Sequence, residues 1–150
     1  MKNGLVYIML FSLLFSYNSI DNYQYYEEID SIEYLLNERI DIMNEFLYGY
    51  KDMDSLEKKL DRIELENLLE NDLDILCKVI DNPTDYELAM NVQVDKINSV
   101  KKSDGNIHIN ADLKWQMRGY DGEFSMIKNY NIKCVKLKKQ MYLASLIYNE

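Results

Sequence analysis

Apolar side chains recur at three- and four-residue steps between residues 29 and 50, which is the spacing of one face of an α-helix. The residues of this stripe are Ile29, Ile32, Leu36, Ile40, Met43, Leu47 and Tyr50. Leu35 and Phe46 widen the stripe, and Gly49 follows its last full turn. The pattern predicts an amphipathic helix over 29–48.

The next thirty residues repeat the helical spacing with two shorter stripes. The stripes consist of Leu56, Leu60 and Ile63, and then of Leu65, Leu69, Leu73, Leu76 and Ile80. Asp54 or Ser55 can cap the first stripe, with Glu57 completing a capping box, and Asn82-Pro83 ends the second. A single helix over 55–81 is one interpretation, but we expect two helices, 55–63 and 65–81.

After Pro83 the apolar period changes from helical to two, which is typical of half-buried strands. The alternating residues are Tyr86, Leu88, Met90, Val92 and Val94, and then Ile107, Ile109, Ala111, Leu113, Trp115 and Met117. Asp104-Gly105 and Asp121-Gly122 fall where two-residue hairpin turns belong, because such turns need positive φ. We therefore expect a meander with strands at 85–101, 107–119, 123–137 and 140–148.

Closing both hairpins on these turns makes the apolar residues of neighbouring strands face each other. The predicted pairs are Val100 with Ile109, Val94 with Trp115, Val92 with Met117, Met117 with Met126, Leu113 with Tyr130, and Ala111 with Ile132. Asp95 faces Lys114 on the polar side. Because a slip of one residue would invert every face, this agreement favours the meander.

The first twenty residues differ from the rest of the chain. Lys2 precedes an uncharged, largely apolar run, and this layout indicates an export signal or an N-terminal anchor. Small residues are missing at the positions that signal peptidase reads, so we favour a retained membrane anchor at 4–20. With Lys2 inside, the remainder lies outside the cell. Secretion after cleavage, or a buried core helix, are the alternatives.

Length, composition and charge limit the possible domain organisation and partners of the chain. The 150 residues suit one domain, and 47% hydrophobic and 29% charged residues are typical of a globular chain. We divide the chain into an anchor or signal at 1–20, a connector at 21–28 and one domain at 29–150. Residues 21–90 carry 20 acidic and 6 basic side chains, whereas 91–150 carry 6 and 10. The net charge of −9 argues against nucleic acid as a partner.

Residue types that carry chemistry are sparse and scattered. Cys77 and Cys134 either form a disulfide or remain free core thiols, and we expect no metal site and no cofactor. His108 lies on the polar face opposite Lys101, with no nucleophile at motif spacing. The carboxylates between 57 and 74 fall on the solvent side of their helices. The sequence therefore names no catalytic residue.

One lysine stands out, because the predicted register puts Lys128 on the apolar face opposite Trp115. An ammonium there can lie over the indole and line a cavity together with Met117 and Tyr130. Alternatively the lysine stem extends to the sheet edge, or a bulge turns it outward. Trp115, Met117, Lys128 and Tyr130 are the candidate ligand-binding residues.

The segment MNEFLYGYKDMDSLEKKL, in which a helix with a late aromatic residue meets a polar turn and a capped helix, resembles the nuclear transport factor 2-like (cystatin-like) superfamily. The resemblance covers roughly 30–148. It implies a bent sheet that wraps a long helix around a conical cavity. Some members are enzymes with Asp or His in the cavity. Others are binding or assembly modules, including membrane-anchored domains of Gram-positive conjugation machinery.

This chain departs from the enzymes of that superfamily, because no His or Asp falls on the predicted cavity face of its second and third strands. We expect an α+β fold in which N-terminal amphipathic helices pack on a curved four-stranded antiparallel meander, a cystatin-like roll. The expected function is a non-catalytic binding or assembly module on the outer face of a bacterial membrane. Its partner is an unidentified protein or a second copy of the chain. The alternatives are a small-ligand carrier or enzyme using the cavity, and, by fold analogy alone, a cystatin-type inhibitor.

Overall fold

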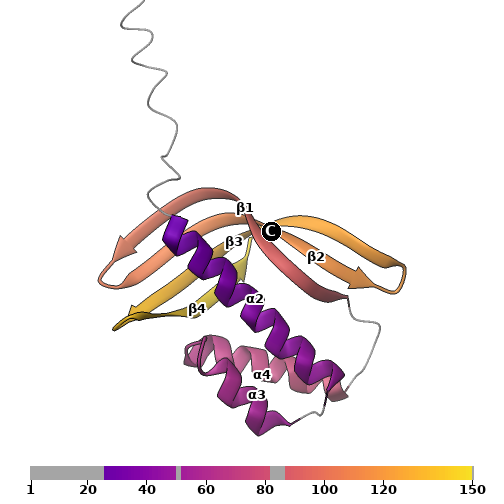
Figure 1. Ribbon diagram of the computed structural model, residues 1–150. Helices are drawn as coiled ribbons and strands as arrows, with labels where there is room; N and C mark the ends of the chain where they lie inside the picture. Colours follow the sequence, from indigo (N-terminus) through magenta and orange to yellow (C-terminus); the bar gives the residue numbers. More distant parts are fainter. Residues whose placement is uncertain (1–25, 50–51, 82–86, 150) are drawn as a thin grey trace, which may run out of the picture.

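The computed structural model describes residues 26–49, 52–81 and 87–149 and shows an α+β chain (Figure 1). Within these ranges, helices α2 (Tyr26–Tyr48), α3 (Met53–Leu60) and α4 (Glu66–Asp81) precede strands β1 (Leu88–Ser103), β2 (Asn106–Gly119), β3 (Gly122–Leu137) and β4 (Gln140–Tyr148). The strands form one open antiparallel sheet in the order β1-β2-β3-β4. The predicted α+β class and meander are confirmed.

The helix boundaries differ from the prediction by a few residues. Helix α2 begins at Tyr26, inside the segment predicted as a connector, because its first turn already places Glu27 and Glu28 at the helix N-terminus. The cap of α3 is Asp52, whose carboxylate accepts a hydrogen bond from the N–H of Asp54 at 3.2 Å. The predicted caps, Asp54 and Ser55, are therefore inside the helix.

The predicted membrane anchor at 4–20 lies outside the described residues. Within the described part of the chain, no helix has both the length and the apolar character that a bilayer span requires.

The two predicted turns behave differently. Asp104 and Gly105 form the β1–β2 turn as expected, with φ of 48° and 80°. The β2–β3 turn consists of Tyr120 and Asp121, and Gly122 follows it with a φ of 121°. The glycine is the first residue of β3 and pairs with Gly119, so the turn lies one residue earlier than predicted and the register moves by two residues. Because side chains alternate between the two faces of a strand, a shift of two residues leaves each side chain on its predicted face.

The shift changes each predicted partner across β2 and β3. Lys128 lies opposite Leu113, whereas the sequence placed it opposite Trp115. The observed pairs are Met117 with Phe124, Trp115 with Met126, Ala111 with Tyr130, and Ile109 with Ile132. The pairs Met117–Met126, Leu113–Tyr130 and Ala111–Ile132 were therefore wrong.

Three irregularities in β1 change the predicted register of the β1–β2 hairpin. The register shifts between Ala89 and Asn91, between Val94 and Lys96, and between Ile97 and Ser99. Val100 still faces Ile109, but Val92 faces Trp115, Val94 faces Leu113, and Gln93 takes the predicted place of Asp95 opposite Lys114. Each extra residue bends its strand and adds twist. The curved ribbon of β1 is visible in Figure 1.

Helix α2 attaches to the edge of β1 through side chains that mimic a neighbouring strand. The N–H of Val92 donates to Asn37 Oδ1 at 3.0 Å, and the carbonyl of Val92 accepts from Asn37 Nδ2 at 2.8 Å. Asn44 Nδ2 donates to the carbonyl of Ala89, and Val94 N–H donates to the carboxylate of Glu33. The free peptide groups of an edge strand are thereby satisfied.

A short segment between α3 and α4 covers part of the opposite edge. Leu65 N–H donates to the carbonyl of Leu143, and Leu143 N–H donates to the carbonyl of Ile63, both at 2.8 Å. Glu64 thus forms a parallel bridge with β4. The pairing places Glu64 between Ile63 and Leu65, with its side chain in the protein interior.

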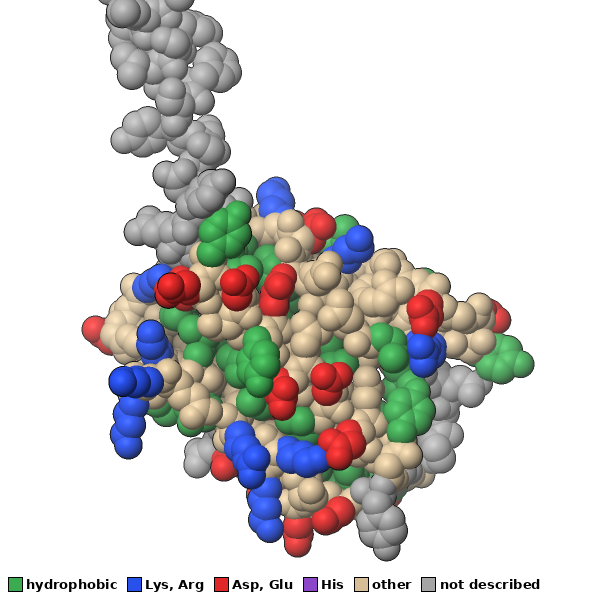
Figure 2. All heavy atoms as spheres, viewed as in Figure 1, with side chains coloured by type: hydrophobic (Ala, Val, Ile, Leu, Met, Phe, Trp, Pro, Cys, Tyr) green, Lys and Arg blue, Asp and Glu red, His purple; other side chains and the backbone are tan. Residues whose placement is uncertain are grey.

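The apolar faces of helices and sheet meet in one core. Its largest fully buried apolar side chains are Ile32, Leu36, Leu60, Val92, Leu113, Ile132, Cys134 and Leu143. Figure 2 shows the face that α2 presents to solvent, with Asp and Glu side chains scattered along the course of the helix.

Replacing Asn37 by Leu should lower the free energy of unfolding by about 2–4 kcal/mol. The substitution keeps the side-chain size but leaves both peptide groups of Val92 without partners, at about 1–3 kcal/mol each. Urea denaturation measures the change. Asn67→Leu, on the exposed surface of α4, is the matched control and should shift stability by less than about 0.5 kcal/mol. Equal effects of both variants would show that the Asn37 bonds contribute nothing.

The two cysteines are free thiols with different exposure. Cys77 is exposed on α4, whereas burial raises the pKa of Cys134 to about 12. We expect a disulfide-forming aromatic reagent to label one thiol in the native chain and both after denaturation. Cys77→Ser should leave no native labelling. Native labelling of that variant would place Cys134 within reach of solvent.

Candidate functional site

A pocket of about 250 Å³ lies between α2, α4 and the beginning of the sheet. Its walls are mostly apolar: Ile40, Met43, Leu47, Ile75, Leu76, Val79, Leu88 and Ala89. Four polar or amphipathic side chains complete it, namely Arg39, Asn44, Glu87 and Trp115. An apolar hollow with a few polar groups is the usual form of a small-molecule site.

Trp115 lines this pocket and carries an unused hydrogen-bond donor. The side chain is 8% exposed on the helix-facing side of β2, and its Nε1 is buried without a partner among the described residues. A buried indole N–H normally donates a hydrogen bond to an acceptor. An unpaired one therefore either lowers the stability of the fold or marks a place where a ligand can bind.

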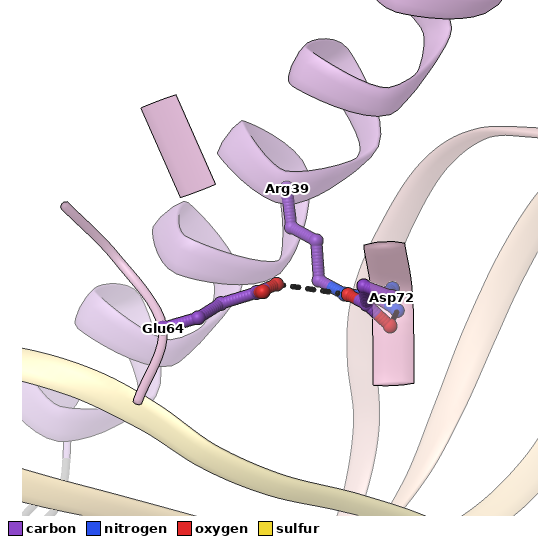
Figure 3. Close-up of polar contacts among 3 residues, drawn as sticks. All are labelled: Arg39, Glu64 and Asp72. Carbon is purple, nitrogen blue, oxygen red and sulfur yellow. Dashed lines mark hydrogen bonds and ion pairs between the residues drawn. The ribbon is translucent and has the colours of Figure 1, made fainter. Parts of the chain in front are cut away.

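Arg39 connects the pocket to a buried cluster of charges (Figure 3). Its Nε donates to Asp72 Oδ2 at 2.5 Å and its Nη2 donates to Asp72 Oδ1 at 2.6 Å. This two-pronged pair joins α2 to α4. The third guanidinium nitrogen, Nη1, donates to none of the described residues.

Glu64 completes the cluster from the opposite side of Arg39, with Oε1 3.1 Å from Arg39 Nε. The single Nε proton already points to Asp72, so neither carboxyl oxygen of Glu64 accepts a hydrogen bond from a described residue. Burial, together with the nearby charge of Asp72, raises the pKa of Glu64 to about 8, although Arg39 opposes the shift. Glu64 is therefore mostly protonated at neutral pH.

With Glu64 neutral, the cluster is a one-to-one pair of Arg39 and Asp72. A buried ion pair is tolerated when its charges balance and its donors are satisfied. The arrangement holds the guanidinium in place, with the donors of Nη1 left over.

Among the predicted ligand-binding residues, only Trp115 lines this pocket. Met117 packs against the core further along β2. Tyr130 lies between Trp115 and Tyr148 in tilted ring contacts, with ring centroids 5.6 Å and 5.7 Å away. The ammonium of Lys128 lies 5.1 Å from the centroid of Tyr148, so the predicted contact with the indole is replaced by one with a phenol ring. The shifted register of β3 is the reason.

Sequence reasoning missed Arg39, Glu64 and Asp72. The expectation that the carboxylates of 57–74 face solvent is wrong for Glu64 and Asp72, each 1% exposed. A signal was present for two of the three. Arg39 follows Leu36 by three positions and Asp72 follows Leu69 by three, so both charges occupy the apolar stripes of their helices.

The outer face of the sheet is polar, and His108 lies there, exposed and opposite Lys101 as predicted. Side-chain amides link neighbouring strands on this face. Asn110 Nδ2 donates to Asn129 and to Asn131, both at 2.9 Å. Asn129 in turn donates to Asp112 at 2.6 Å, and this bond lowers the pKa of the exposed Asp112 carboxyl.

Comparison with protein-family models finds no match to this chain, and comparison with curated proteins finds no relative.

Glu64→Gln should change how stability depends on pH. Below pH 4.5 the folded and unfolded chains both carry the Glu64 proton, and between 4.5 and about 8 only the folded chain does. The stabilising contribution of Glu64 therefore declines as pH rises through this window and is lost above it, at up to about 1.4 kcal/mol per pH unit. The glutamine has no such dependence, so the stability difference between variant and wild type should rise with pH.

Denaturant titrations at several pH values measure this difference. Glu70→Gln, on the exposed side of α4, is the matched control and should track the wild type. Parallel curves for Glu64→Gln and wild type from pH 5 to about 8 would mean that Glu64 ionises as in water.

Proposed function

We propose that the chain is a non-catalytic binding module that holds a small, largely apolar ligand in the pocket between α2, α4 and the sheet. The carrying observation is a mostly apolar pocket lined by Arg39 and by Trp115, whose buried Nε1 has no partner among the described residues. Both groups donate hydrogen bonds, so the ligand has an oxygen acceptor, a carboxylate or carbonyl, at that end.

The other polar side chains that line the pocket, Asn44 and Glu87, carry acceptor oxygens. Asn44 uses its amide nitrogen on the carbonyl of Ala89, and the Arg39 fork is fixed by Asp72. The lining side chains offer no nucleophile beside a base, which favours binding over catalysis.

The size of the pocket limits the ligand. Drug-sized molecules occupy about 300–1,000 Å³, and a cavity of about 150 Å³ is enough for benzene. A pocket of about 250 Å³ therefore suits one or two rings or a short aliphatic chain.

The wider setting of this module is a proposal carried by the sequence. Attachment to a membrane through 4–20, an extracytoplasmic domain and kinship with the nuclear transport factor 2-like superfamily are each compatible with a ligand pocket. An assembly role through a protein partner remains the alternative. The experiment below tests the pocket directly.

Trp115 is the only tryptophan of the chain, so its fluorescence reports on the pocket. We expect octanoate to change the emission saturably, because its chain fills the apolar walls and its carboxylate accepts from the free donors. Val79→Phe fills the pocket from α4 and should weaken octanoate binding by about tenfold or more, a loss of at least about 1.4 kcal/mol.

Ile127→Phe, on the exposed outer face of β3, is the matched control and should bind as the wild type does. An emission change that never saturates, or one that both variants alter equally, would contradict a ligand site at Trp115.

A further inference from the structure

A second hollow, of about 360 Å³, lies on the outer face of the sheet, away from the pocket at Trp115. We propose that this hollow, the outer groove, is a binding site for a phosphate group. The groove is lined by Lys101, His108 and Lys133, with hydroxyl and amide side chains around them.

The register places these groups in one row across all four strands. Lys101 of β1 pairs with His108 of β2, His108 pairs with Lys133 of β3, and Lys133 pairs with Ser145 of β4. Strands lie about 4.8 Å apart, so the two lysine backbones are roughly 10 Å apart with the imidazole between them. Two flexible ammonium groups at that separation can converge on one oxyanion above the ring.

No carboxylate of the described residues neutralises this row. Lys59, Lys78 and Lys102 each form an ion pair with a Glu or Asp, whereas Lys101 and Lys133 form none within the described part of the chain. The two ammonium groups, separated by the strand that carries His108, repel each other weakly. A bound anion would remove that repulsion.

The nearest carboxylate along β2 on this face is engaged elsewhere. Asp112 lies two rows away and accepts hydrogen bonds from Asn98 and Asn129. The amides of Asn110 and Asn131 bond to one another, so they form a fixed floor beside the lysines.

The remaining donors suit a tetrahedral oxyanion. The hydroxyls of Ser99 and Ser145 line the groove and bond to none of the described residues. Lysine ammonium groups bind phosphate as point charges, and hydroxyl and imidazole N–H groups can approach other oxygens of the same phosphate. The shared chemistry is a phosphate ester, either of a soluble metabolite or of a phospholipid headgroup.

Nuclear magnetic resonance of the full chain tests the outer groove. Glycerol 3-phosphate should shift the backbone signals of Lys101, His108, Lys133 and Ser145 saturably. Lys101→Gln with Lys133→Gln should weaken binding by about tenfold or more. Lys96→Gln with Lys114→Gln removes the same charge further along the same face and should leave binding unchanged. Vesicles of phosphatidylcholine with and without phosphatidylglycerol form the second arm.

Binding of glycerol 3-phosphate alone assigns a soluble ester, and vesicle binding with the same dependence on Lys101 and Lys133 assigns a headgroup. The proposal is overturned if neither probe binds at up to about 10 mM phosphate. It is also overturned if both double variants weaken binding equally, since a diffuse charge effect would then explain it. The octanoate experiment is unaffected by either result.

Discussion

The amide of Asn37 exchanges two hydrogen bonds with the peptide of Val92, and this contact determines where α2 lies on the sheet. Two residues later the same helix carries Arg39, which reaches α4 through Asp72. One wall of the pocket is therefore formed by α2. The Asn37 amide, which bonds as a neighbouring strand would, holds this helix to β1, and the Arg39–Asp72 ion pair holds it to α4. Neither contact is apolar, although the core around them is.

Much of the fold follows from side-chain period alone. The strand predicted at 140–148 coincides with β4, and the two-residue alternation of 107–117 places Trp115 inside and His108 outside. The errors arise where one extra residue changes a register. In β1 the register shifts between Ala89 and Asn91, between Val94 and Lys96, and between Ile97 and Ser99, where β1 inserts residues against β2. An Asp-Gly pair does not determine which two residues form the turn: Asp104 and Gly105 both lie in it, whereas Gly122 is already the first residue of β3.

The candidate site was less visible. Trp115 was identifiable, because its strand position and rarity single it out, but its partners come from three distant segments. Arg39 and Asp72 carried a local signal, since each interrupts an apolar helical stripe. Glu64 carried none, because its burial depends on the pairing of 63–65 with Leu143, nearly eighty residues away. Long-range docking of an irregular segment leaves no period in a sequence.

The protection of the sheet margins limits how copies of the chain can combine. A fibre built by continuing a sheet needs an open margin on each side of every subunit. Here Asn37, Asn44 and Glu33 occupy the Ala89–Val94 stretch of one margin with side-chain hydrogen bonds, and the backbone of 63–65 occupies the other margin at Leu143. A strand of a second copy can pair only with the parts of these margins that α2 and the 63–65 segment leave open, so both contacts restrict continuation of the sheet.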